Sequence, residues 1–195
     1  MGVTITTLSK NPGDIGTAAY GYNGGLMRES VPRNGTLSAG GAPLSTGVMY
    51  SVGIQLYAGD VVNKLAFRTG TAGFTTITNH WFALYDDSAT PALLAQTPDN
   101  GSTAWGATTA RELTLASTVV VPRTGLYYAS LCAVFTGTPN IVGVGSTSQA
   151  TLAGMTVATQ KALALTSGSS LTTTAPATIA SPSTSAVLAY CTARA

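Results

Sequence analysis

The sequence predicts an all-β fold: a jelly-roll-like antiparallel β-sandwich with an extended N-terminal arm. The main evidence is a series of short segments in which apolar and polar residues alternate, with turn signals about every 8 to 12 residues. No segment has the apolar spacing of a long amphipathic helix. Charged residues make up only 8% of the 195 residues, well below the roughly 25% of an average domain, so helices rich in lysine and glutamate are not expected.

This length suits one domain plus an arm, and we expect the boundary near residue 45, with residues 1–45 forming the arm and residues 46–195 the sandwich. Turn and breaker signals such as Asn11-Pro12-Gly13 follow one another closely in the arm, so only short extended pieces fit between them. A solvated linker would lack apolar side chains, but the arm contains several. We predict that they dock the arm on a neighbouring surface: Ile5, Leu8, Ile15, Tyr20, Tyr22, Leu26 and Met27.

The strand signals begin at residue 48. Residues 48–57 alternate in polarity, and Ala58-Gly59-Asp60 supplies a turn into a second strand over residues 61–69. In each strand every second residue is predicted to share one face: Val48, Tyr50, Val52, Ile54 and Leu56 in the first, and Val61, Asn63, Leu65, Phe67 and Thr69 in the second.

Residues 79–87 are predicted to form a strand that is buried on both faces. Trp81, Ala83 and Tyr85 alternate with Phe82 and Leu84, and polar residues close both ends of the segment. We expect Trp81, Phe82, Leu84 and Tyr85 to fill the space between the two sheets of the sandwich.

The remaining strands are predicted at residues 92–96, 111–115, 119–121, 126–135, 141–144 and 186–191. Asn100-Gly101 and Pro122-Arg123-Thr124-Gly125 are the clearest turns between them. From residue 146 the chain is rich in serine, threonine, alanine and glycine, but it keeps too many apolar residues for a solvated linker. We predict a long meandering loop that belongs to the domain, with a short helix over residues 155–165.

Catalytic, metal and cofactor sites are not expected. A nucleophilic serine or cysteine needs a positioned base, and the only histidine, His80, has just Asp86 or Asp87 as a partner on its own strand. We predict a surface or strand-end position for His80 and a turn at Asp86-Asp87-Ser88. The two cysteines, Cys132 and Cys191, are predicted to be buried free thiols, the alternative being a disulfide that links two strands.

The charge and hydropathy patterns exclude two further classes of protein. The net charge of +2 comes from scattered single residues, so nucleic-acid binding is not expected. The longest apolar run, residues 126–135, is shorter than the roughly 20 residues of a membrane-spanning helix, and the N-terminus lacks the pattern of a secretory signal. We expect a protein that works where it is made or leaves the cell by lysis, and whose low-charge surface is covered by other copies or partners.

Two tryptophans differ in their expected roles. Trp81 lies within an apolar strand and is predicted to be part of the core. Trp105 follows the Asn100-Gly101 turn in a loop rich in glycine, alanine and threonine, where an exposed ring could contact a sugar or a partner protein.

Three stretches resemble a β-sandwich domain of virion proteins from tailed bacteriophages, especially those that infect actinobacteria. They are Leu-Tyr-Ala-Gly-Asp-Val-Val-Asn-Lys-Leu-Ala-Phe-Arg-Thr-Gly-Thr-Ala at 56–72, Asn-His-Trp-Phe-Ala-Leu-Tyr-Asp at 79–86 and Val-Pro-Arg-Thr-Gly-Leu-Tyr-Tyr at 121–128. The resemblance covers about residues 45–145 and continues more weakly to the end. It implies a minor tail, fibre or head-decoration protein without shared catalytic residues, and it does not extend to the arm.

These observations together lead us to expect a non-enzymatic virion structural protein, a capsid decoration or minor capsid protein that docks through its arm. The expected partners are other copies in a homotrimer and a major capsid or tail protein, with assembly in the host cytoplasm and release by lysis. The absence of heptad repeats argues against a fibre. The alternative is a tail-associated receptor- or carbohydrate-binding module that uses Trp105 against host-surface glycans.

Overall fold

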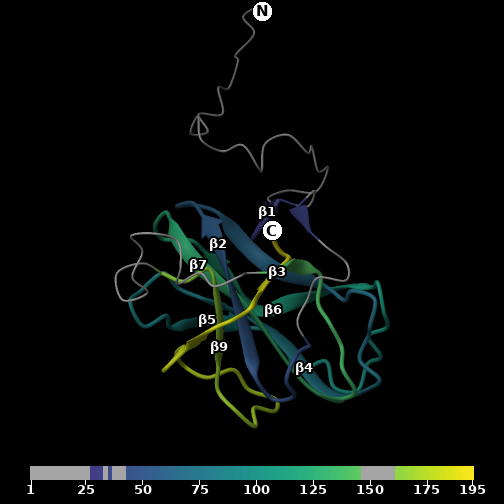
Figure 1. The fold of residues 1–195 in the computed structure, drawn as a ribbon. Helices are drawn as coiled ribbons and strands as arrows, with labels where there is room; N and C mark the ends of the chain where they lie inside the picture. The colour runs from purple at the N-terminus through teal and green to yellow at the C-terminus, as the bar shows by residue number, and fades with distance from the viewer. Residues whose placement is uncertain (1–26, 33–34, 37–42, 146–160) are drawn as a thin grey trace, which may run out of the picture.

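The computed structural model describes residues 27–32, 35–36, 43–145 and 161–195 (Figure 1). This part of the chain contains twelve β-strands: β1 (Met27–Glu29), β2 (Met49–Leu56), β3 (Val61–Arg68), β4 (Thr76–Tyr85), β5 (Leu93–Gln96), β6 (Ala110–Val120), β7 (Gly125–Thr136), β8 (Gly143–Gly145), β9 (Ala164–Ser167), β10 (Ser183–Thr184), β11 (Val187–Ala189) and β12 (Cys191–Arg194). The predicted all-β class is confirmed. Within the described residues, no helix has the length and hydropathy needed to cross a membrane.

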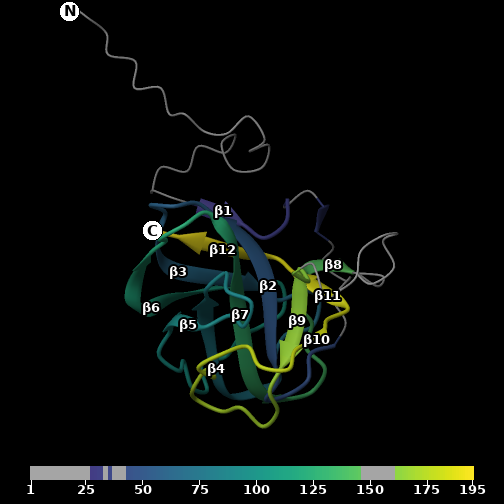
Figure 2. The ribbon, with the colours of Figure 1, turned by 90° about the vertical axis from the view of Figure 1, so that its left-hand side faces the viewer.

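The strands form two main sheets that pack face to face, as Figures 1 and 2 show. One sheet has the order β1-β12-β3-β6, and the other has the order β10-β9-β2-β7-β4-β5. A small third sheet pairs β8 with β11. All pairings are antiparallel.

The connectivity is that of a jelly roll. Eight strands pair as one long hairpin, first with last: β1 with β12, β2 with β7, β3 with β6 and β4 with β5. This hairpin is rolled up so that β12 lies beside β3 and β7 lies beside β4. Because β1 is the first strand of the roll, residues 27–29 are part of the sandwich, although the sequence pattern places them in the arm.

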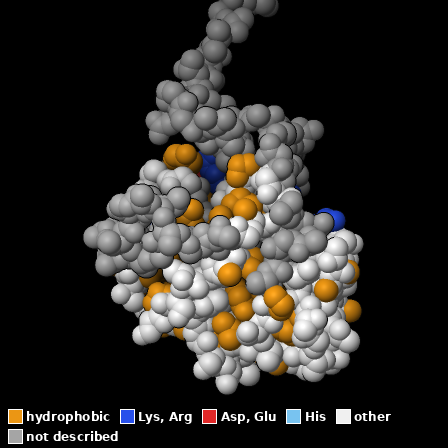
Figure 3. All heavy atoms as spheres, in the orientation of Figure 1, with side chains coloured by type: hydrophobic (Ala, Val, Ile, Leu, Met, Phe, Trp, Pro, Cys, Tyr) orange, Lys and Arg blue, Asp and Glu red, His pale blue; other side chains and the backbone are white. Residues whose placement is uncertain are grey.

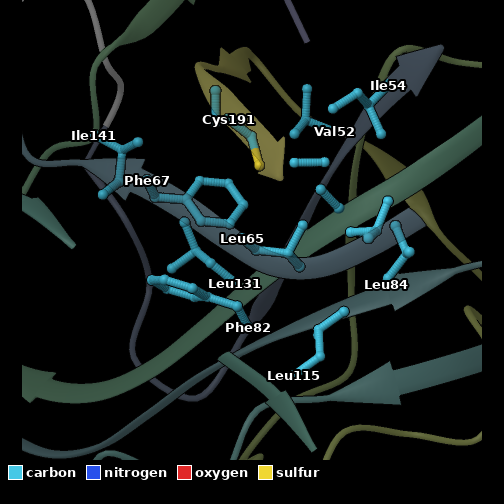
Figure 4. Packing of buried hydrophobic residues seen from close by; sticks show 14 of the residues in the cluster. Val52, Ile54, Leu65, Phe67, Phe82, Leu84, Leu115, Leu131, Ile141 and Cys191 are labelled. Atoms are coloured by element: carbon cyan, nitrogen blue, oxygen red, sulfur yellow. The ribbon is translucent and has the colours of Figure 1, made fainter. Parts of the chain in front are cut away.

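The space between the two sheets is filled by apolar side chains from both (Figure 4). Alternate residues of β2 point into it as predicted, with Val52, Ile54 and Leu56 fully buried. Phe67 of β3 meets Phe82 of β4 across the interface in an edge-to-face contact, with ring centroids 4.8 Å apart. This inter-sheet core is the main source of hydrophobic stabilisation.

The predicted face of β3 is wrong at its beginning. The register shifts between Val62 and Lys64, where a bulge lets the following residues keep their core positions. As a result Val62 is fully buried and Val61 is 38% exposed. The alternation in the sequence does not reveal the bulge, because it depends on how β6 pairs with β3.

Strand β4 contributes to two different apolar clusters. Phe82 and Leu84 lie in the inter-sheet core, as predicted. Trp81, Ala83 and Tyr85 point to the opposite side of the sheet, so the expectation that Trp81 and Tyr85 lie between the sheets is wrong. They form an outer cluster together with residues of β2, β7, β9 and a long loop: Met49, Tyr128, Cys132, Leu165, Ala175 and Ile179.

The loop that closes the outer cluster spans residues 168–182, and we call it the covering loop. Side chains of the sheet hold its backbone: Trp81 Nε1 donates to the Thr172 carbonyl at 2.8 Å, and Tyr85 Oη donates to the Pro176 carbonyl at 2.9 Å. Figure 2 shows the loop crossing β4 and β7. Ser170 and Ser181, near its two ends, have positive φ angles of 54° and 44°. The covering loop is therefore held against the outer face of this sheet.

Three further expectations are settled by the pairing of strands. The strands predicted at residues 111–115 and 119–121 are parts of one strand, β6, which ends at Val120. Residues 186–191 contribute to two strands, β11 and β12. The predicted helix over residues 155–165 is wrong at its end, because Ala164 and Leu165 pair with β2 in strand β9; residues 155–160 lie outside the described residues. Sequence patterns missed β1, β9 and β10, which have at most four residues each.

Both cysteines are buried free thiols, so the alternative of a disulfide is excluded. Cys132 belongs to the outer cluster and Cys191 to the inter-sheet core. Burial raises the pKa of the Cys132 thiol to about 12 and also raises that of Cys191. Neither sulfur is therefore available as a thiolate nucleophile in the folded protein.

Candidate functional site

The residues predicted to dock the arm fall into two groups. Ile5, Leu8, Ile15, Tyr20, Tyr22 and Leu26 lie outside the described residues. Met27 lies in β1 opposite Arg194 of β12, with its sulfur 3.8 Å from a guanidinium nitrogen of that arginine. Met27 is therefore placed in the sheet, at the point where the N-terminal segment joins the sandwich.

The base of the N-terminal segment is held by a buried ion pair. Arg28 of β1 is 5% exposed, and its guanidinium donates two hydrogen bonds to the Asp60 carboxylate, at 2.8 Å and 2.9 Å. Asp60 also accepts a hydrogen bond from the Tyr57 amide at 3.0 Å, and the guanidinium lies 4.6 Å from the centre of the Tyr57 ring. This bidentate contact fixes β1 to the turn between β2 and β3. We call it the β1 latch.

Sequence reasoning missed the β1 latch. The two charged residues are 32 positions apart, and only the turn at Ala58-Gly59-Asp60 was visible as a pattern. The unusual scarcity of charge was the one available signal, because a lone arginine and a lone aspartate in an apolar context are candidates for a buried pair.

A second group of charges lies on the outer face of the β1-β12-β3-β6 sheet. Glu112 of β6 accepts from Arg194 at 2.9 Å and lies 3.5 Å from the Lys64 ammonium. Glu29 of β1 accepts a hydrogen bond from the Tyr190 hydroxyl at 2.9 Å. The Lys64 and Glu112 side chains are 41% and 35% exposed, so each of these pairs contributes little to stability.

Trp105 is fully buried, and the expectation of an exposed ring is wrong. Its ring stacks on Phe74 with centroids 4.9 Å apart, and its Nε1 donates to the Thr109 carbonyl at 2.9 Å. The loop that carries it packs against residues 70–74 so closely that a Cβ on Gly73 would lie 2.5 Å from the backbone of Gly106. A ring in this position cannot serve as a platform for a sugar.

His80 is also buried rather than placed at the surface or at a strand end. Its Nδ1 lies 3.1 Å from the Gly101 carbonyl, which can only accept, so Nδ1 carries the proton. Its Nε2 lies 2.9 Å from Nδ2 of Asn100 and accepts a hydrogen bond from it. Burial lowers the pKa of His80, and the neutral ring acts as a clamp for the loop at Asp99-Asn100-Gly101.

The burial of His80 predicts a loss of stability in mild acid. In the unfolded chain the imidazole binds a proton near its ordinary pKa of about 6.5, whereas the folded protein resists this until a lower pH. The free energy of unfolding should therefore fall as the pH drops below about 6.5, by at most about 1.4 kcal/mol per pH unit. Urea unfolding measured between pH 6.5 and pH 5 tests this.

The control for this prediction is His80→Gln, which keeps one donor and one acceptor but does not titrate. Because the sequence contains one histidine, this variant should have a nearly flat profile over the same pH range. Equal slopes for the two proteins would show that the pH dependence does not come from His80.

The aspartate pair organises the bend after β4, as predicted. Asp86 Oδ1 accepts from the Ser88 amide at 3.1 Å and from the Ala92 amide at 2.8 Å. Asp87 pairs with Arg123 at 2.6 Å, and this contact lowers the pKa of the Asp87 carboxyl. In the part of the chain that the structure describes, no three histidine, cysteine or acidic side chains gather as they would for a metal ion.

The candidate functional site is the region around β1, where the N-terminal segment joins the sandwich. The residues that could have supported catalysis or sugar binding, His80, Cys132 and Trp105, are committed to packing. Comparison of the chain with family models, curated proteins and solved structures finds no match.

Proposed function

We propose that the protein is a non-enzymatic structural protein on the surface of a bacteriophage particle, as a capsid decoration or minor capsid protein. It docks on a major capsid protein through its N-terminal segment and associates with other copies of itself. In this proposal it is assembled in the host cytoplasm and reaches the outside by lysis.

The observation that carries the proposal is the β1 latch. Docking through an N-terminal segment requires that a force on this segment reaches the folded body without unravelling it. The β1 latch joins the first strand to the β2–β3 turn through a buried bidentate ion pair. Arg28 lies close to the point where the N-terminal segment joins the sandwich.

Two further features support the proposal. Jelly rolls are common among viral capsid proteins, although they also occur in lectins and other families, so the fold alone does not choose between them. Charged side chains are sparse on the face shown in Figure 3, where hydrophobic side chains are scattered among uncharged ones. Such a surface is poorly protected against association.

The alternative of a tail-associated glycan-binding module loses its main support. That alternative rested on Trp105, whose ring is buried between Phe74 and the inter-sheet core. Glycan binding by the intact protein would contradict our proposal.

Two truncations test the docking role. Removing residues 1–26 should leave a folded body that no longer decorates particles, because the cut falls before β1. Removing residues 1–45 should also lower the melting temperature, because it takes away the β1 latch and the buried side chains of Val31 and Leu44. Thermal unfolding followed by circular dichroism and co-sedimentation with undecorated particles measure the two effects.

The shorter truncation is the informative one. If it bound particles as well as the full chain, docking through the N-terminal segment would be wrong. If both truncations melted at the temperature of the full chain, β1 would not be an integral strand.

A further inference from the structure

The free edges of the two main sheets differ in how well they are protected. β1 and β10 have only three and two residues, and the edge of β5 is covered by the covering loop, because Leu93 N donates to the Ala177 carbonyl at 2.9 Å. β6 has eleven residues and is the long uncovered edge of the described strands. An uncovered edge presents unpaired backbone groups that a further strand can bind.

The hydrogen-bond pattern shows which groups of β6 are unpaired. Thr69 N donates to the Thr109 carbonyl at 3.1 Å, so this pair is a hydrogen-bonded one. Because such pairs alternate along an antiparallel ladder, Arg111 and Leu113 also bond to β3. The amide and carbonyl groups of Ala110, Glu112 and Thr114 then point away from the sheet, toward solvent.

The side chains along this edge prevent pairing only in part. Residues 110–121 contain no proline, and their two charged residues are Arg111 and Glu112. Val120 is 63% exposed and lies opposite Val61 on the outer face, forming an exposed apolar pair. This edge is protected by the charges of Arg111 and Glu112 and by the bulge, where Asn63 alone faces residues 115–118. Regular pairing with a further strand is therefore confined to residues 110–114.

We propose that β6 is a self-association edge, which pairs antiparallel with β6 of a second copy across a two-fold axis. The register places Leu113 opposite Leu113 of the second copy, and the regularly paired residues are 112–114 of each chain, because residues 110 and 111 then face the bulge. Glu112 then lies opposite Thr114 of the second copy, and the outward backbone groups of these residues form hydrogen bonds in both directions. The two four-stranded sheets become one continuous eight-stranded sheet.

Charge decides between the possible registers. Centring the pair on Glu112 would bring two carboxylates directly opposite each other, which is destabilising. In the register centred on Leu113, Glu112 shares a row with Thr114 of the second copy and with Lys64 beyond it, because Lys64 and Thr114 are paired in the ladder. Glu112 and Lys64 of the second copy then lie in one row with Thr114 between them, while each chain keeps its own Lys64–Glu112 pair.

This inference rests on the self-association part of the proposed function and not on docking. A two-fold edge contact closes after two copies, so it gives a dimer in place of the trimer that the sequence suggests. The two proposals can be tested separately, because dimer formation is measured in solution and docking is measured by binding to particles.

Disulfide trapping in the full chain tests the register. Leu113→Cys should form a disulfide-linked dimer under mild oxidation, because the two sulfurs meet at the axis in a non-hydrogen-bonded pair. The matched control is Val120→Cys, which is on the same strand but beyond the bulge and should stay monomeric on a non-reducing gel. The native cysteines are both buried and do not interfere. Equal trapping of the two variants, or none of Leu113→Cys, would overturn the proposal.

A second pair of variants tests the backbone hydrogen bonds. Thr114→Pro removes an outward amide and leaves the ladder to β3 intact, whereas Thr114→Ala keeps the amide. Light scattering should give the mass of two chains for the parent protein and for Thr114→Ala, and that of one 19.6 kDa chain for Thr114→Pro. A parent protein that is monomeric or trimeric, or a Thr114→Pro dimer, would contradict the proposal.

Discussion

Replacing Asp60 with alanine is expected to destabilise the protein by about 3–5 kcal/mol, because it leaves the Arg28 guanidinium buried without its carboxylate. Both side chains are nearly excluded from solvent, at 6% and 9% exposure, so water cannot replace the lost partner. The same change removes the acceptor for the Tyr57 amide. Urea unfolding gives the free energy, and hydrogen exchange at the amides of residues 27–30 should rise if β1 detaches.

The matched control for Asp60→Ala is Glu112→Ala, which removes an acid from an exposed ion-pair group in the neighbouring strand. The Glu112 side chain is 35% exposed, and the free energy of unfolding is expected to fall by less than about 1 kcal/mol. Similar losses for the two variants would show that the β1 latch is no stronger than a surface pair. The proposed role of the latch at the base of the tether would then lose its support.

Replacing Trp105 with alanine is expected to lower the free energy of unfolding by about 3–5 kcal/mol, because the substitution leaves a cavity in the core. The ring contacts Phe74 and Phe82, and its Nε1 bonds to the Thr109 carbonyl, so both packing and a buried hydrogen bond are lost. Thermal and urea unfolding measure the loss. Trp105→Phe should recover much of the packing but not the hydrogen bond.

The Trp105 variants also separate a structural role from a binding role. A sugar-binding ring would lower glycan affinity when removed and leave stability nearly unchanged. If Trp105→Ala unfolded at the same urea concentration as the parent protein, the burial of this ring would contribute nothing to the free energy of unfolding. This result would again favour the glycan-binding alternative.

The strands that were predicted correctly share one property, which is a local signal. β2, β4 and β7 are long, alternate in polarity or are apolar throughout, and are bounded by glycine, proline or aspartate turns. These features depend only on neighbours in the chain. The turn at Asp86 was recognised for the same reason, because its hydrogen bonds are made to residues 88 and 92.

The expectations that were wrong depend on partners far away in the chain. Trp105 was expected to be exposed because its neighbours are small and polar, but residues 70–74 and Phe82 close over it. His80 is buried because the loop at Asn100 folds back on its ring. A polar local context cannot show that another segment will cover a side chain.

The sequence by itself determined the all-β class, the positions of the long strands and the scarcity of charge, because alternation and composition are local properties. The tertiary structure decided which face of each strand meets which cluster, that β1 belongs to the roll, and that Arg28 meets Asp60. It also decided that the edge of β6 is uncovered while that of β5 is not. These features follow from pairing between distant segments, which the order of residues along the chain does not display.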